Sequence, residues 1–127
     1  MSKEWAFCGI AELQAALAAG EVTSRGLVEY FRDRIEKLNP ALNAVVATNF
    51  DDALSRADAA DEARAKGDSW GPLHGIPMTI KDTFEVVGMP CTAGSRSLAK
   101  HIPAENAFTV QRLVDAGAIP FGKTNVP

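Results

Sequence analysis

The residue of this sequence that is best placed to do chemistry is Lys81, which comes near the end of the stretch GPLHGIPMTIKD. The run IPMTI before it is apolar and strand-like, and turn residues open that run. A lysine amine with the ordinary pKa of about 10.4 is almost fully protonated at pH 7. Desolvation at the end of a buried strand would lower its pKa and turn the amine into a base. The local pattern therefore has two interpretations, a surface lysine that pairs with a carboxylate such as Asp82 and a catalytic amine, and by itself it favours the first.

Glycine-rich turns on both sides of Lys81 strengthen the catalytic interpretation. The stretches GPLHG, VGMP and AGS supply backbone that can turn sharply or approach a ligand closely, and binding residues often lie on such loops. The stretch CTAGSRS adds hydroxyl groups at Thr92, Ser95 and Ser97, each of which is by itself typical of a turn or a cap. The residues expected to wall the amine are apolar, namely Met78, Ile80 and Phe84.

The stretch GAIPFGKT at 117–124 matches the phosphate-loop pattern G-x-x-x-x-G-K-[ST] letter for letter. Such a loop must follow a strand and open a helix, so that backbone N–H groups cradle the phosphates. Here the helical pattern QRLVDA precedes Gly117, and Pro120 removes an N–H from the middle of the supposed cradle. We therefore predict a helix cap at Gly117, a buried strand with Ile119 and Phe121 in the core, and no nucleotide site.

Helices are predicted to fill the first segment of the chain, up to about residue 69. Apolar residues at helical spacing predict a helix over 10–17 and a second one that begins after Thr23-Ser24 and ends at Asn39-Pro40. An alanine-rich third helix is expected over 51–66, with a glycine as its stop signal.

The remaining segment, 70–127, has a different pattern. Short apolar runs broken by glycine and proline predict strands at 76–80 and over the stretch FEVVGMPCT at 84–92. A helix is expected over 104–116, followed by a strand over 118–124. This order of strand, helix and strand favours an α/β fold, and we expect residues 1–127 to belong to a single domain.

Composition and charge exclude several classes of partner. The 127 residues carry a net charge of −3, so no basic footprint for nucleic acid or an anionic membrane is visible, and no apolar run is long enough to span a bilayer. The opening MSKEWAFCGI does not resemble a secretory signal. The two cysteines, Cys8 and Cys91, are far apart, and His74 and His101 are isolated. We therefore expect a reducing, cytoplasmic setting and no metal site.

Three motifs in this order make the sequence resemble the amidase signature family of amide hydrolases: GPLHGIPMTIKD, CTAGS and AGAIPFGKTNVP. The stretch GEVTSRGLVEYFRDRIEKLNPALNAVV is similar to the N-terminal helices of that family, so the resemblance covers nearly the whole chain. It implies an α/β/α fold around a large mixed sheet, of which this chain carries the helices and the first strands. It also implies a small-molecule amide as the substrate and neither a metal nor an organic cofactor.

The resemblance further implies a serine–cis-serine–lysine triad and assigns its lysine to Lys81. In that mechanism the lysine deprotonates a bridging serine, which activates a nucleophilic serine, while backbone amides stabilise the oxyanion. The strand end that carries the lysine is expected to be shaped by its neighbours, and the CTAGS turn is expected to support the site. The residues in these supporting positions are Gly75, Asp82, Thr92, Gly94 and Ser95.

The two serines of the triad have no counterpart in this sequence. No GGSSGG-like run occurs, and Ser95 and Ser97 match a separate AGS motif of the family. The chain thus carries one of three triad members and is expected to be inactive alone, although its full-length parent would hydrolyse an amide. The alternative is a truncated, non-catalytic remnant or an assembly module that associates with a second copy or a complementing chain, because an unfinished sheet leaves an edge and apolar surface unmet. Nothing in the sequence points to the branch of the family that amidates transfer RNA.

Overall fold

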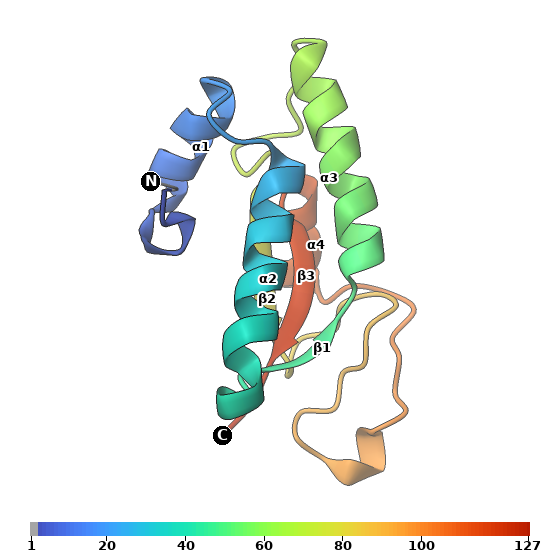
Figure 1. The fold of residues 1–127 in the computed structure, drawn as a ribbon. Coiled ribbons are helices and arrows are strands. Elements are labelled where there is room, and N and C mark those ends of the chain that lie inside the picture. Colours follow the sequence, from blue (N-terminus) through green and yellow to red (C-terminus); the bar gives the residue numbers. More distant parts are fainter. Residues whose placement is uncertain (1–2) are drawn as a thin grey trace.

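A small mixed sheet lies at the centre of the computed structural model, which describes residues 3–127 (Figure 1). Its strands are β1 (Val45–Thr48), β2 (Pro77–Lys81) and β3 (Ile119–Thr124), in the order β1-β3-β2. Strand β1 runs antiparallel to β3, and β2 runs parallel to it. The central strand is the most deeply buried, since every residue from Ile119 to Lys123 is covered.

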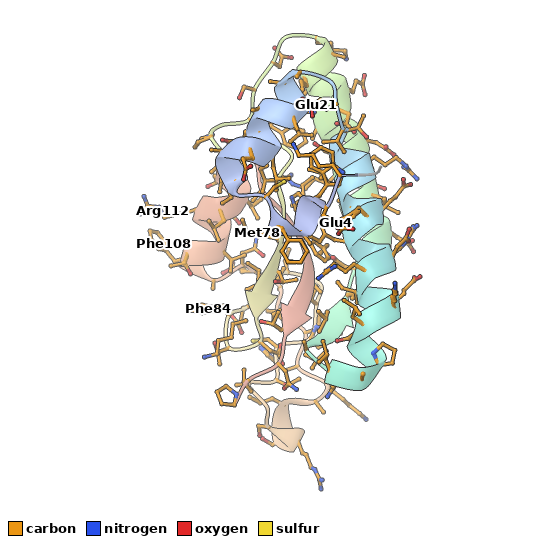
Figure 2. The ribbon with its side chains drawn as sticks, turned by 60° about the vertical axis from the view of Figure 1, so that its left-hand side comes forward. Glu4, Glu21, Met78, Phe84, Phe108 and Arg112 are labelled. Carbon is orange, nitrogen blue, oxygen red and sulfur yellow. The ribbon has the colours of Figure 1, made fainter. Side chains whose placement is uncertain are left out.

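Helices cover both faces of this sheet, which confirms the expected α/β architecture. Helices α2 (Ser24–Leu42) and α3 (Phe50–Ala65) lie on one face, and α4 (Phe108–Asp115) lies on the other (Figures 1 and 2). Helix α1 (Ile10–Ala18) stands to one side of α2. Two short 3-10 turns complete the described elements, Trp5–Phe7 and Arg96–Leu98.

The three helices predicted in the first part of the chain are confirmed, although α2 continues past its predicted end. Its start is capped by the Thr23 hydroxyl, which accepts a hydrogen bond from the Gly26 N–H at 2.9 Å. Pro40 lies inside the last turn, where its missing N–H costs a single hydrogen bond. The helix ends where Asn43 turns left-handed at φ 50° and donates its N–H to the Asn39 carbonyl at 2.7 Å.

Strand β1 was not predicted and interrupts the segment that we expected to be helical. It has only four residues, too few for a pattern to distinguish a strand from the tail of the preceding helix. Its partner β3 lies near the other end of the sequence, so the pairing that creates the strand is entirely tertiary.

The predicted strand over 84–92 is wrong, and the last helix begins at Phe108 rather than near residue 104. The apolar residues of this stretch are buried without joining a ladder: Val86, Met89 and Cys91. Two loop segments bond to each other instead, through Gly88 N–H to the Pro103 carbonyl and Cys91 N–H to the His101 carbonyl. The Ala107 N–H, one residue before α4, donates to the Glu85 carbonyl, which ties the start of the helix to this loop.

Two apolar clusters hold the layers together, one on each face of the sheet. The first joins α2 and α3 to β3 through Val28, Ala57, Ile119 and Phe121. The second joins β2 to α4 and the loop after β2, with Ile80, Met89 and Val110 at its centre. Burial of one large apolar side chain stabilises a fold by about 1.5–3 kcal/mol, so both clusters help to hold the helices on the sheet.

Candidate active site

Lys81 is the last residue of β2 and lies beside Thr124, its register partner at the end of β3. Its side chain is exposed, so the apolar wall that we predicted from its neighbours is not formed in the described part of the chain. The reason is geometric: side chains alternate along a strand, so Ile80 faces the α4 side while Lys81 faces away from it. Phe84 is 44% exposed and projects outward beside the carboxyl end of β2 (Figure 2).

Asp82, the next residue, is buried, and its carboxylate accepts hydrogen bonds from two other segments of the chain. Its Oδ1 accepts a hydrogen bond from Lys123 Nζ at 2.9 Å. Its Oδ2 accepts from the Thr92 hydroxyl at 2.5 Å and from the Thr92 N–H at 3.3 Å. Lys123 Nζ also donates to the Pro90 carbonyl at 3.0 Å. We call this cluster of Asp82, Pro90, Thr92 and Lys123 the Asp82 junction.

The junction keeps Asp82 ionised despite its burial. Burial by itself raises the pKa of this carboxyl group, because a carboxylate is poorly solvated inside a protein. The hydrogen bonds from Thr92 and Lys123, together with the positive charge of Lys123, outweigh that effect and leave the pKa of Asp82 below its usual range. The carboxylate is therefore a fixed negative charge directly after Lys81.

Lys123 is the site residue that the sequence analysis missed. It is fully buried on β3, next to Ile80 in the parallel register, and it forms a salt bridge with Asp82. The surface interpretation of Lys81 is right about its exposure, but the lysine that pairs with Asp82 is Lys123. The available signal was a lysine at the end of the apolar run AIPFG, since a cation in a buried strand must be paired.

The CTAGS turn is attached to the same junction. The Ala93 N–H donates to the Asp82 carbonyl at 3.0 Å, and the Cys91 thiol lies 3.5 Å from that oxygen. Ala93 and Gly94 both have left-handed backbones, with φ 48° and 75°. Such backbone is costly for a residue other than glycine and is often found near functional sites. The Ser95 hydroxyl is exposed and hydrogen-bonds that of Ser97 at 2.8 Å.

Of the predicted supporting residues, the structure brings Asp82, Thr92 and Gly94 to the Lys81 end of β2 and places Gly75 at the other end. Gly75 has φ 76°, and a side chain there would collide with the Ser24 hydroxyl and come within 2.7 Å of Arg64 Nη2. Gly75 belongs to a tight turn that contacts the segment after α4, because the Gly75 N–H donates to the Gly117 carbonyl at 2.9 Å.

The stretch 117–124 has the structure that we predicted for it. Gly117 follows α4 with φ 103°, and a side chain there would lie 2.6 Å from the His74 Cα. Ile119 and Phe121 are buried on β3, and Lys123 points into the Asp82 junction.

Two observations concern other classes of site. Within residues 3–127, no group of three or more His, Cys, Asp or Glu side chains is arranged to hold a metal ion. None of the helices in that range combines the length and the apolar character needed to cross a membrane.

Comparisons with known proteins agree with the motifs. The model of the Amidase family matches residues 26–127. A glutamyl-tRNA(Gln) amidotransferase subunit of Chloroflexus aurantiacus is 49% identical over 112 residues, which are 88% of this chain and 23% of the relative. The corresponding protein of Alkalilimnicola ehrlichii is 44% identical over 117 residues, 92% of this chain and 24% of the relative.

A solved structure shows the same agreement in three dimensions. The peptide amidase of Stenotrophomonas maltophilia has a TM-score of 0.91 and 41% identity, and the match covers 97% of this chain and 26% of that one. The chain thus spans about a quarter of the length of the relatives it matches. By name these relatives include both a peptide amidase and part of a transfer-RNA amidotransferase, a branch that the sequence did not indicate. The chain belongs to the amidase signature family.

Proposed function

We propose that residues 1–127 form part of one amidase domain that hydrolyses the carbon–nitrogen bond of a small carboxylic amide, with Lys81 as its base. The two serines of the family triad are then to be sought outside these residues, in further polypeptide or in a partner chain. The relatives differ by name in what they act on, so the proposal is limited to the amide bond that their reactions share. The two cysteines, both free and far apart, suit a cytoplasmic location.

In this reaction Lys81, acting as the base, takes the proton of the bridging serine, and that serine takes the proton of the nucleophilic serine. The nucleophile attacks the amide carbonyl, the carbon–nitrogen bond breaks, and the leaving amine takes up a proton. Water then attacks the acyl-enzyme, so that the products are a carboxylic acid and an amine. Neither a metal nor an organic cofactor takes part in these steps.

The observation that carries the proposal is the position of Lys81 at the carboxyl end of β2, beside the carboxyl end of its parallel neighbour β3. In α/β sheets, ligands bind beyond the carboxyl ends of parallel strands. The residue after Lys81 is held by a buried ion pair, and the glycine-containing CTAGS turn is bonded to it. This corner pre-organises the amine as a catalytic base requires, and the proposal takes the polypeptide that carries the two serines to cover the exposed amine and desolvate it.

The test is hydrolysis of simple carboxylic amides by the natural protein that carries this sequence and by its Lys81→Ala variant. We expect turnover to fall about a thousandfold or more, while the unfolding midpoint stays unchanged because the side chain is exposed. Lys66→Ala is the matched control, since Lys66 is an exposed lysine on the surface of the same domain, paired with Glu62. Turnover of Lys81→Ala equal to that of the Lys66→Ala control would exclude Lys81 as the base.

A second candidate, an assembly module that associates with another chain, is favoured by two features of the surface. Strand β2 lies at one edge of the described sheet, so its outer backbone groups have no strand partner there. A groove of about 400 Å³ between α2 and the sheet is lined mainly by apolar side chains, including Ile35, Met78 and Phe121. The intact mass of the protein in its source cells, measured together with the mass of the native complex, distinguishes the two. A native mass near 13.5 kDa with no second chain would contradict both candidates.

A further inference from the structure

We propose that Lys123 is a positioning residue of this amidase: through its ion pair with Asp82 it fixes both Lys81 and the CTAGS turn. The inference rests on the proposed function, since it takes Lys81 to be the base. Lys123 does not face the same side of the sheet as Lys81. The register places Lys123 beside Ile80 and places Lys81 beside Thr124. Its influence must therefore pass through the residue that follows Lys81.

The backbone on the far side of Lys81 is held at three points of Asp82. The Asp82 N–H donates to the Thr124 carbonyl at 2.9 Å, which extends the parallel ladder one residue beyond Lys81. The Asp82 carbonyl accepts from the Ala93 N–H, and the carboxylate binds Lys123. A residue held in this way cannot rotate without breaking bonds on two neighbouring segments, so the point and direction in which the Lys81 side chain leaves the backbone are fixed by its neighbour.

The carboxylate also divides its two oxygens between two segments. Oδ1 binds the ammonium group on β3, and Oδ2 binds the hydroxyl and N–H of Thr92 at the start of the left-handed turn. Lys123 adds a direct bond to the same loop through the Pro90 carbonyl. One buried cation thus fixes the relative placement of the proposed base and the turn.

The ion pair of Lys123 and Asp82 differs from one that only stabilises the fold. An ammonium group that is removed from water needs compensation, and both compensating groups here come from segments that flank the proposed site. The pair of Lys66 and Glu62 has a similar separation, 2.8 Å, but its side chains are 65% and 68% exposed and both lie at the C-terminal end of α3. Lys66 is therefore the matched control.

The experiment measures kcat and KM for amide hydrolysis by the natural protein and its Lys123→Met and Lys66→Met variants. The assay temperature lies well below the thermal unfolding midpoint of each variant, so that all molecules are folded. For Lys123→Met we expect kcat to fall at least about tenfold and KM to change less than about twofold, because misdirection of the base affects the chemical step rather than substrate binding. For Lys66→Met we expect both constants to be unchanged. An unaltered kcat in folded Lys123→Met would overturn the inference.

A double variant keeps the inference testable if Lys123→Met does not fold. Combining Asp82→Asn with Lys123→Met leaves no buried charge uncompensated, so this protein is expected to fold. A kcat that remains at least about tenfold low in the folded double variant supports positioning by the ion pair, whereas native kcat contradicts it. If the proposed function itself is wrong and Lys81 is not the base, the result is different: Lys81→Ala then hydrolyses the amide as fast as the unaltered protein.

Discussion

Two lysines lie near the carboxyl ends of neighbouring parallel strands, and their environments are opposite. Lys81 at the end of β2 is exposed, whereas Lys123 on β3 is completely buried and bound to Asp82. In the sequence, the catalytic interpretation required Lys81 to be desolvated, whereas Lys123 belonged to a misleading phosphate-loop match and to the last family motif without being assigned a role. Burial of a lysine is therefore not decided by the apolar run before it, since the face on which the side chain lies has the greater effect.

The comparison also separates two tasks that one charged residue type can perform. A buried ammonium group must keep its partners, so it holds segments together and has little freedom to exchange protons. An exposed amine at the rim of the sheet is free to meet a substrate or a second segment of protein. In this chain the buried Lys123 joins β3 to Asp82 and to the Pro90 carbonyl, and Lys81 is exposed at the end of β2.

The largest stability difference is expected between Lys123→Met and Lys81→Met. The first leaves the Asp82 carboxylate buried without its cation and should lower the free energy of unfolding by about 3–5 kcal/mol. The second changes an exposed side chain and should stay within about 0.5 kcal/mol. Urea unfolding of the natural protein with each variant gives both values. Equal losses would mean that the two lysines are not distinguished by burial as described.

A smaller effect is expected from Thr92, which binds the other oxygen of the same carboxylate. Thr92→Val keeps the shape of the side chain but removes the hydroxyl that donates to Asp82. We therefore expect the free energy of unfolding to fall by about 1.5–3 kcal/mol. Thr92→Ser keeps the hydroxyl and should recover most of that loss. The same urea experiment measures both, and a serine variant as unstable as the valine variant would assign the effect to packing of the methyl group.

The smallest change in the free energy of unfolding is expected when the pH is lowered. Because the pKa of Asp82 is lowered in the folded protein, the unfolded chain binds a proton at this group more readily. Its contribution to stability is complete above the unfolded pKa of about 3.9 and is lost as the pH falls through the lower, folded value. Between pH 5 and pH 2, the free energy of unfolding should therefore fall more steeply in the unaltered protein than in the double variant Asp82→Asn, Lys123→Met. Parallel curves would show that Asp82 does not carry this dependence.

Local signals in the sequence were enough to predict the helices, the strand that carries Lys81 and the family. Residues such as Thr23 and Gly117 are signals of this kind, because a cap and a left-handed stop depend on the chain within a few positions. The motif GPLHGIPMTIKD places Lys81 at the end of a strand for the same reason, and β2 ends there.

The features that depend on distant partners could be learned only from the folded chain. Strand β1 exists because β3 pairs with it, and the stretch 84–92 is a buried loop because its N–H and carbonyl groups bond to another loop instead of a strand. Lys123 and Asp82 lie 41 positions apart in the sequence and 2.9 Å apart in space. No local pattern contains that contact, because the pairing of two parallel strands across a helix is what places an ammonium group and a carboxylate together on one face of the sheet.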